Sequence, residues 1–246
     1  MKISDELYIV GGGANGIGLT DRYDSNIYLI QGGDQLALVD AGACVGGAEY
    51  LLSNVEADGF GRQQIGYLFL THCHADHSGG SAELREKTGL RVCISQAEAD
   101  VLRKGDEAAS GLNEARADGL YPRNYRFRPC EVDIELTDAQ TIHVGYLAVT
   151  AIHVPGHSPG SMCYLFRGKD AMYLLTGDTV FCTGRISLLN CRGSSLSAYR
   201  TNLKKLHGLG VDALMPGHFG FCMRYGQDHI DKAVEAMRHI APPPNI

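Results

Sequence analysis

The segment from Leu68 to Gly80 constrains this chain more than any other, because an apolar run that suits a buried strand leads directly into metal-ligating side chains. It reads LFLTHCHADHSGG. Three imidazoles and one carboxylate between His72 and His77 are costly to remove from water unless something compensates them. A divalent metal ion does so, since neutral imidazole and carboxylate are among its usual ligands. The segment therefore predicts a metal site at the end of a buried strand.

The spacing inside this segment predicts two ligand positions. His72 and His74 are two residues apart, so on an extended backbone they face the same side. Asp76 and His77 can turn toward a second position if the chain bends at Ala75. Cys73 lies between two ligands and, on an extended backbone, points away from them.

Three later motifs each place a polar side chain at the end of an apolar run. His157 lies in VPGHSPGS, a turn rich in Gly and Pro that can fix the direction of an imidazole. Asp178 emerges from LLTGDT, and His218 ends MPGH. Taken singly, each is an ordinary loop residue, but together with the first segment they make a candidate ligand set.

The H-x-H-x-D-H pattern, followed in order by these three motifs, resembles the signature of the metallo-β-lactamase superfamily, which includes glyoxalase II, lactonases and sulfur dioxygenases. The resemblance implies an α/β fold, a four-layer αβ/βα sandwich with helices outside two sheets. It assigns one metal to His72, His74 and His157 and a second to Asp76, His77 and His218, with Asp178 bridging both. It also implies that Asp40, at the end of an early strand, supports the site. The remaining histidines match no motif position and are interpreted as structural or surface residues: His143, His153, His207, His229 and His239.

The chemistry implied is hydrolysis at two divalent ions about 3.5–4 Å apart. Zinc is the first choice, and iron or manganese accepts the same ligands. A metal ion lowers the pKa of its bound water to about 7, so hydroxide is available at neutral pH. This hydroxide attacks the carbonyl of a thioester, lactone or other ester. Asp76 and Asp178 are the candidate catalytic residues, because Asp76 can orient the nucleophile or carry a proton and Asp178 bridges the ions.

Asp178 discriminates between members of the family. Its context, TGDTVF, is similar to the glyoxalase II pattern, whereas β-lactamases with the same histidine motif generally lack this aspartate. Hydrolysis of glutathione thioesters is not favoured, since glyoxalase II binds glutathione through a helical domain after its last ligand and 28 residues follow His218. The alternatives are a mononuclear iron sulfur dioxygenase using His72, His74 and His157, a β-lactamase, and a non-catalytic metal-binding sensor.

Bulk properties limit the other classes of function. A chain of 246 residues is expected to form a single domain, with a cap-like insertion at 105–129. The net charge of -6 argues against a nucleic-acid partner, so a small-molecule substrate is expected. With neither an export signal nor a membrane-length apolar run in the sequence, a cytoplasmic protein with eight reduced cysteines is expected. The sequence contains no pattern that indicates the oligomeric state.

Local patterns predict the main helices and one loop. Apolar spacing predicts helices over 48–57, 81–87, 196–206 and 230–240, the last stopped by three prolines. Ser95 to Glu98 matches a capping box that would begin another helix. Gly11 to Gly16 matches G-x-G-x-x-G, but the next residues are too polar and too few for the helix of a dinucleotide site. A glycine-rich loop over the active site is the better interpretation of 11–25.

Overall fold

Two β-sheets form the centre of the molecule in the computed structural model, which describes residues 1–239 and 242–246. The first sheet has the order β1-β2-β3-β4-β5-β6, and the second has the order β11-β10-β9-β8-β7. The first contains β1 (Leu7–Gly11), β2 (Ile27–Gln31), β3 (Leu36–Val39), β4 (Ile65–Phe69), β5 (Arg91–Ser95) and β6 (Ile134–Leu136). The second contains β7 (Thr141–Val144), β8 (Leu147–His153), β9 (Met162–Arg167), β10 (Met172–Gly177) and β11 (Ala213–Pro216).

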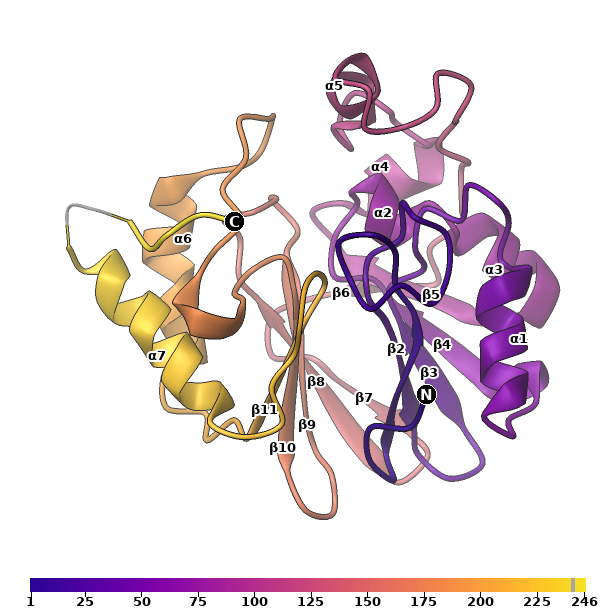
Figure 1. Cartoon of the computed structure of the whole chain (residues 1–246), viewed down its shortest axis with the longest axis horizontal. Helices are drawn as coiled ribbons and strands as arrows, with labels where there is room; N and C mark the ends of the chain where they lie inside the picture. The colour runs from indigo at the N-terminus through magenta and orange to yellow at the C-terminus, as the bar shows by residue number, and fades with distance from the viewer. Residues whose placement is uncertain (240–241) are drawn as a thin grey trace.

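Helices cover the outer faces of both sheets (Figure 1). On the first sheet these are α1 (Glu49–Ala57), the one-turn α2 (Ala75–Ser78), α3 (Ser81–Thr88) and α4 (Ala99–Lys104), with η1 (Arg62–Gln64) before β4 and α5 (Leu112–Ala117) above the sandwich. On the second they are η2 (Cys182–Gly184), α6 (Leu196–Asn202), η3 (Leu203–Leu206) and α7 (Gly226–Met237). The predicted four-layer sandwich is confirmed.

Three buried clusters hold these layers together. The middle cluster joins the inner faces of the two sheets, with Tyr28 and Phe69 from the first against Tyr164 from the second. The outer clusters lie under α1 and under α7, where Leu52 and Ile230 are fully buried. Strands β2 and β4 are buried nearly throughout because both of their faces are covered, so they read as continuous apolar runs.

Parallel pairing of β3, β4 and β5 brings the C-terminal ends of these strands to one edge of the first sheet. Strands β10 and β11 are also parallel, and their C-terminal ends reach the corresponding edge of the second sheet. Tyr164 on β9 links the two sheets there, since its hydroxyl donates to Leu70 O at 2.6 Å. Every predicted ligand motif therefore follows a strand that ends near this edge or lies in the turn between β8 and β9.

The helix predictions hold with three differences. The stripe predicted over 196–206 is helical, but it divides into α6 and the 3-10 turn η3. The capping box at Ser95 to Glu98 is wrong: α4 begins at Ala99 without a side-chain cap, because Glu98 turns inward to other partners. The final helix, predicted over 230–240, runs from Gly226 to Met237. Ile240, the last predicted residue of its stripe, lies outside the described residues.

Residues 12–26 contain turns and bends rather than a helix, which excludes the dinucleotide fingerprint. Within the described part of the chain, no helix has the length and apolar character needed to span a bilayer. All eight cysteines are in described positions and are free thiols.

Candidate metal centre

The bend predicted at Ala75 is present and separates the ligands of the first motif. His74 is extended, with φ -63° and ψ 147°, and α2 begins at the next residue. Thr71 to His74 thus follow β4 as an irregular segment with bends at Thr71 and Cys73, while Asp76 and His77 lie on the one-turn helix. Thr71 O accepts a hydrogen bond from Met162 N at 2.8 Å, which ties this segment to β9.

His72, His74 and His157 form the first cluster. His157 Nε2 lies 3.2 Å from His72 Nε2 and 2.9 Å from His74 Nδ1. The other nitrogen of His157, Nδ1, lies 2.9 Å from Ser187 O, and a carbonyl can only accept. Nδ1 therefore carries the proton, and the lone pair of Nε2 points toward the two neighbouring imidazoles.

Asp76, His77 and His218 form the second cluster. His218 Nε2 lies 3.0 Å from Asp76 Oδ2 and 3.3 Å from His77 Nε2. Gly217 permits this approach, because a Cβ at that position would lie 2.6 Å from His77 Cε1 and 2.7 Å from Asp178 Oδ1. The glycine of the MPGH motif is thus required by close packing around the ligands.

Asp178 lies between the two clusters. Its Oδ2 is 3.7 Å from His157 Nε2 in the first cluster and 3.5 Å from His218 Nε2 in the second. Its Oδ1 is 3.4 Å from His77 Nε2. The structure thus brings all seven predicted residues into one contiguous group.

Asp40 supports this group from the end of β3. Its Oδ2 lies 2.8 Å from His77 Nδ1, and its Oδ1 accepts hydrogen bonds from Thr71 N and Oγ1 at 2.8 and 3.0 Å. Asp40 holds a left-handed φ of 65°, a conformation that Asp adopts more readily than most residues. With the Asp40 carboxylate beside it, Nδ1 of His77 carries a proton, so Nε2 is the ring nitrogen that faces the cluster.

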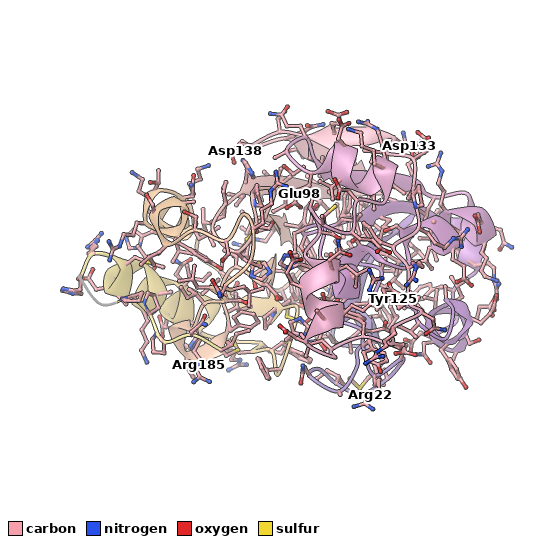
Figure 2. All side chains as sticks on the ribbon, turned by 90° about the horizontal axis from the view of Figure 1, so that it is seen from above. Arg22, Glu98, Tyr125, Asp133, Asp138 and Arg185 are labelled. Carbon is pink, nitrogen blue, oxygen red and sulfur yellow. The ribbon has the colours of Figure 1, made fainter. Side chains whose placement is uncertain are left out.

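Two supporting residues were not found from the sequence. The Tyr199 hydroxyl lies 3.1 Å from Asp178 O and 3.0 Å from Ser187 O, so it holds the backbone beside Asp178 and the carbonyl that orients His157. Glu98 accepts hydrogen bonds from Cys73 N at 2.8 Å and Gly160 N at 3.2 Å, joining the loops that carry the first cluster. Glu98 lies in the interior (Figure 2). Tyr199 resembled any core residue of a helix stripe, and Glu98 matched a helix cap, so neither carried a distinguishing signal.

Burial and neighbouring charge act differently on the two clusters. Burial lowers the pKa of His74 to about 3, and it also lowers the pKa of His72 and of His157. Burial acts in the same direction on His77 and His218, but the carboxylates of Asp76 and Asp178 outweigh it and raise the pKa of both. The first cluster is therefore a set of neutral donors, and the second gathers negative charge that requires a cation.

The donor set fits divalent metal ions. Five imidazoles and two carboxylates face one space. In the first cluster, neutral imidazole nitrogens that oppose one another at 2.9–3.2 Å cannot all be satisfied by protons. Two buried polar atoms of the group, Asp178 Oδ1 and His218 Nδ1, have no hydrogen-bond partner among the described residues. Such side chains are the ligand types of zinc, iron and manganese.

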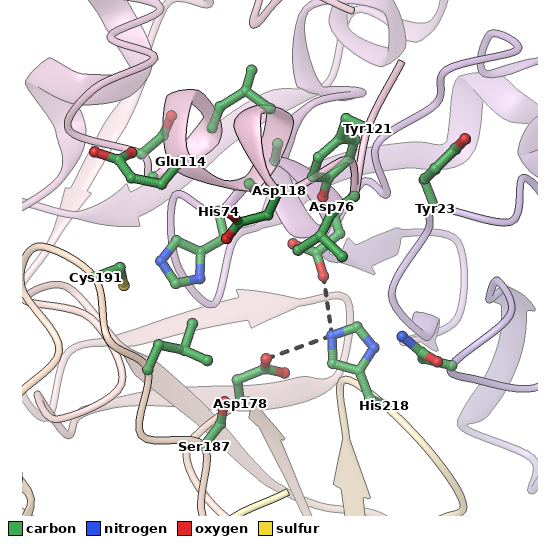
Figure 3. Close-up of a pocket in the computed structure, with 18 of the residues that line it drawn as sticks. Tyr23, His74, Asp76, Glu114, Asp118, Tyr121, Asp178, Ser187, Cys191 and His218 are labelled. Atoms are coloured by element: carbon green, nitrogen blue, oxygen red, sulfur yellow. Dashed lines mark ion pairs between the residues drawn. The ribbon is translucent and has the colours of Figure 1, made fainter. Parts of the chain in front are cut away.

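A cleft of about 530 Å³ opens onto the two clusters, a size typical of small-molecule sites. Figure 3 shows His218 joined by ion pairs to Asp76 above it and to Asp178 beside it, with Glu114 and Asp118 of the α5 region higher in the view. The 11–25 segment contributes Tyr23, whose ring stacks on Tyr121 at 5.6 Å. Tyr121 in turn stacks on Tyr125 at 5.3 Å. These contacts hold two segments far apart in sequence against each other beside the cleft.

This sandwich, with histidine and aspartate clusters at the edge of its two sheets, defines a class of metal-dependent hydrolases. The model of the metallo-β-lactamase superfamily matches residues 20–218, and the chain belongs to this superfamily. The family resemblance seen in the motifs is confirmed, and with it the assignment as a metal-binding hydrolase.

Characterised relatives within the superfamily include thioesterases. The chain is 30% identical over 232 residues to the acyl-coenzyme A thioesterase MBLAC2 of Homo sapiens, covering 85% of this chain and 80% of that protein. It is 32% identical over 169 residues to a hydroxyacylglutathione hydrolase of Anaeromyxobacter dehalogenans, covering 69% of this chain and 50% of that protein. Among solved structures, BJP-1, a subclass B3 metallo-β-lactamase of Bradyrhizobium japonicum, superimposes with a TM-score of 0.73 at 22% identity, covering 96% of this chain and 89% of that one. This structural likeness concerns the fold.

Proposed function

We propose that this protein is a dinuclear metallo-hydrolase that cleaves an acyl thioester. The observation that carries the proposal is the position of Asp178, whose carboxylate lies within 3.7 Å of imidazole nitrogens in both clusters. A carboxylate placed in this way suits a bridge between two ions. The thioesterase relatives, MBLAC2 above all, support the choice of a thioester.

In this proposal His72, His74 and His157 hold one ion, and Asp76, His77 and His218 hold the other, with zinc as the first candidate. When bound, two such ions supply Lewis acidity and lower the pKa of a coordinated water to about 7. No serine or cysteine nucleophile is then needed.

We assign the proton handling to Asp76. Its side chain is about one-fifth exposed and faces the cleft, whereas Asp178 is nearly buried. Hydrogen bonding to His218 Nε2 fixes Asp76 Oδ2, and the charge of His77 lowers the pKa of Asp76 although burial opposes this. Asp76 therefore remains ionised and can orient the attacking water, accept its proton and pass that proton to the sulfur of the leaving thiolate. The products are a carboxylic acid and a thiol.

Tyr121 adds a second polar group at the cleft. Its hydroxyl lies beside Asp76 (Figure 3), and burial, together with the negative charge of Asp76 and a hydrogen bond to it, raises the pKa of the phenol. Tyr121 therefore stays protonated and acts as a donor, and in the proposal it orients the Asp76 carboxylate.

The segment 105–129 acts, in our proposal, as a cap on a single domain and binds the acyl group. Leu112 and Leu120 line the cleft from this segment, and Leu189 and Phe219 line it from the second half of the chain. Apolar side chains on both sides of the ligand clusters suit the hydrocarbon part of an acyl thioester.

The test is to determine bound metal per chain and to assay the loaded protein against an acyl-coenzyme A, a glutathione thioester, a lactone and a β-lactam. We expect about two ions per chain and the highest kcat/KM on a thioester. Highest kcat/KM on the lactone or the β-lactam would overturn the choice of substrate. A metal-loaded protein inert to the whole panel would favour a sensor, and a single iron with oxygen uptake on a persulfide would favour a sulfur dioxygenase.

A further inference from the structure

A second group of metal-ligand side chains lies in the C-terminal half of the chain. It consists of Cys182, Cys222 and His229, whose sulfur and nitrogen ligand atoms all lie within 4.8 Å of one another. None of these residues belongs to the histidine and aspartate clusters described above. All three are half-buried, so the group is neither sealed in the core nor free in solvent.

Three separate elements bring these residues together. Cys182 begins η2, which packs against α7, the helix that carries His229. Cys222 is fixed by a two-way backbone bridge to Leu214 on β11, with distances of 2.9 and 3.1 Å. This convergence requires the tertiary fold, since more than forty residues separate the first member from the last.

A hydrogen bond from the residue after Cys182 fixes the imidazole of the third member. Thr183 adopts a left-handed φ of 68°, which costs energy for a β-branched residue. In that conformation Thr183 N donates to His229 Nδ1 at 3.1 Å. The hydrogen bond keeps the Nδ1 lone pair free of a proton, and a metal ion would compete with the Thr183 amide for it.

The ligand types indicate which ions the group would take. Two sulfurs and one imidazole nitrogen are the donors of structural and catalytic zinc sites, and thiolates also select Cu(I). A cleft of about 370 Å³ lined by all three residues leaves room for a fourth ligand from solvent. We propose that Cys182, Cys222 and His229 bind one thiophilic metal ion, with zinc as the first candidate and water as the fourth ligand.

An ion here would act on the loops that carry Asp178 and His218. Cys182 follows Asp178 by four residues, and Cys222 follows His218 by four. Between these positions the rings of Phe181 and Phe219 meet edge to face at 6.1 Å. Coordination of Cys182 and Cys222 by one ion would therefore tie the two loops together beyond their ligands.

Cobalt(II) separates this site from the other clusters, because only a thiolate ligand produces the intense ultraviolet sulfur-to-cobalt charge-transfer band. We expect the band in the full-length protein after cobalt loading and its loss in Cys182→Ser and in Cys222→Ser. Cys44→Ser, which alters a half-buried thiol outside the group, should retain it. Metal analysis should show one equivalent fewer in the Cys182→Ser/Cys222→Ser double variant than in the wild type.

A measurement on the unaltered chain avoids dependence on the folding of the variants. Alkylation of Cys182 and Cys222, followed by peptide mass spectrometry, should be slowed at least tenfold by added zinc and restored by a chelator. Cobalt loading without the band, equal alkylation with and without zinc, or a Cys182–Cys222 disulfide in protein kept under reductant would each overturn the proposal. None of these readouts depends on the hydrolase activity.

Discussion

Asp40 Oδ2 lies 2.8 Å from His77 Nδ1, and the same carboxylate accepts two hydrogen bonds from Thr71. One buried side chain thus orients a ligand of the second cluster and fixes the backbone that begins the first. Partners of this kind set the tautomer and the direction of a ligating imidazole.

We expect Asp40→Asn to weaken metal binding at the second cluster about 10- to 100-fold, as is usual when such a partner is lost. Asn also tolerates the left-handed backbone at this position, so the effect reports on the charge rather than on backbone strain. Competitive titration with a metal-sensitive chelator measures the affinity. Asp34→Asn, at an exposed turn, is the control, and equal affinity in both variants would remove Asp40 from the site.

Asp178→Asn should lower metal content by one ion per chain and reduce kcat/KM at least about 100-fold, because charge stabilisation by a metal ion amounts to several kcal/mol. The substitution preserves the volume of the side chain and removes its charge between the two clusters. Elemental analysis and a thioester assay measure both effects, with the exposed Asp170→Asn as control. If the number of metal ions per chain and kcat/KM were both unchanged, no bridging carboxylate would be needed.

Tyr121→Phe should lower kcat about 10- to 100-fold without loss of metal, since a hydrogen bond to a charged group contributes about 1.5–3 kcal/mol. The ring stacking with Tyr23 and Tyr125 persists in this variant, so the cap remains in place. Steady-state kinetics measures the fall in kcat, and metal analysis shows whether the metal content is unchanged. A kcat equal to that of the wild type would exclude a role for the hydroxyl.

Arg116 holds the 105–129 segment in shape, with Nη1 donating to Tyr125 O at 2.7 Å and Nη2 to Glu107 Oε2 at 2.6 Å. We expect Arg116→Ala to raise KM several-fold with a smaller change in kcat, because the apolar wall of the cleft loosens while the ligand clusters stay intact. Limited proteolysis should also cut this segment faster than in Arg123→Ala, whose side chain lies on the exposed surface of the same segment. A change in kcat alone would contradict the assignment as a binding cap.

The carboxyl of Asp133 is expected to make a pH-dependent contribution to the stability of the fold. Burial raises the pKa of its carboxyl, but hydrogen bonds from Arg85 and Val92 N outweigh burial and hold the pKa below its ordinary value of 3.8. A group with a depressed folded pKa stabilises the fold above its unfolded pKa, and that stabilisation is lost as the pH falls through the folded pKa. Asp133 lies at the edge of the molecule in Figure 2 and is about one-quarter exposed, so solvent screening limits the effect.

We therefore expect Asp133→Asn to lower the free energy of unfolding by about 1 kcal/mol at pH 7. The difference from the wild type should shrink as the pH falls below about 4. Urea denaturation of both proteins across this range measures it, and pH effects from the rest of the chain cancel in the comparison. A difference that is constant with pH would show that the carboxylate charge is not its source.

Local sequence was sufficient for the first motif and for the superfamily. Strand β4, the bend at Ala75 and the alternation of His72 with His74 depend on neighbours along the chain, so apolar pattern and spacing predict them. The MPGH and TGDT motifs were also identified from residue type and context. The sequence was less informative wherever one residue type has two common uses, as with Glu98, which matched a helix cap but bonds to the loops of the first cluster.

The sequence by itself determined the residue types of the candidate centre and the alternation of strands and helices, because these depend on side-chain chemistry and local periodicity. Only the tertiary structure decided that Asp178 lies between the two clusters, that Tyr199 holds the carbonyl behind His157, and that Cys182 meets Cys222 and His229. Each of these relationships joins segments that are adjacent only after the sheets pack. Such contacts are fixed by strand order and by close packing between layers, which no local pattern of residues encodes.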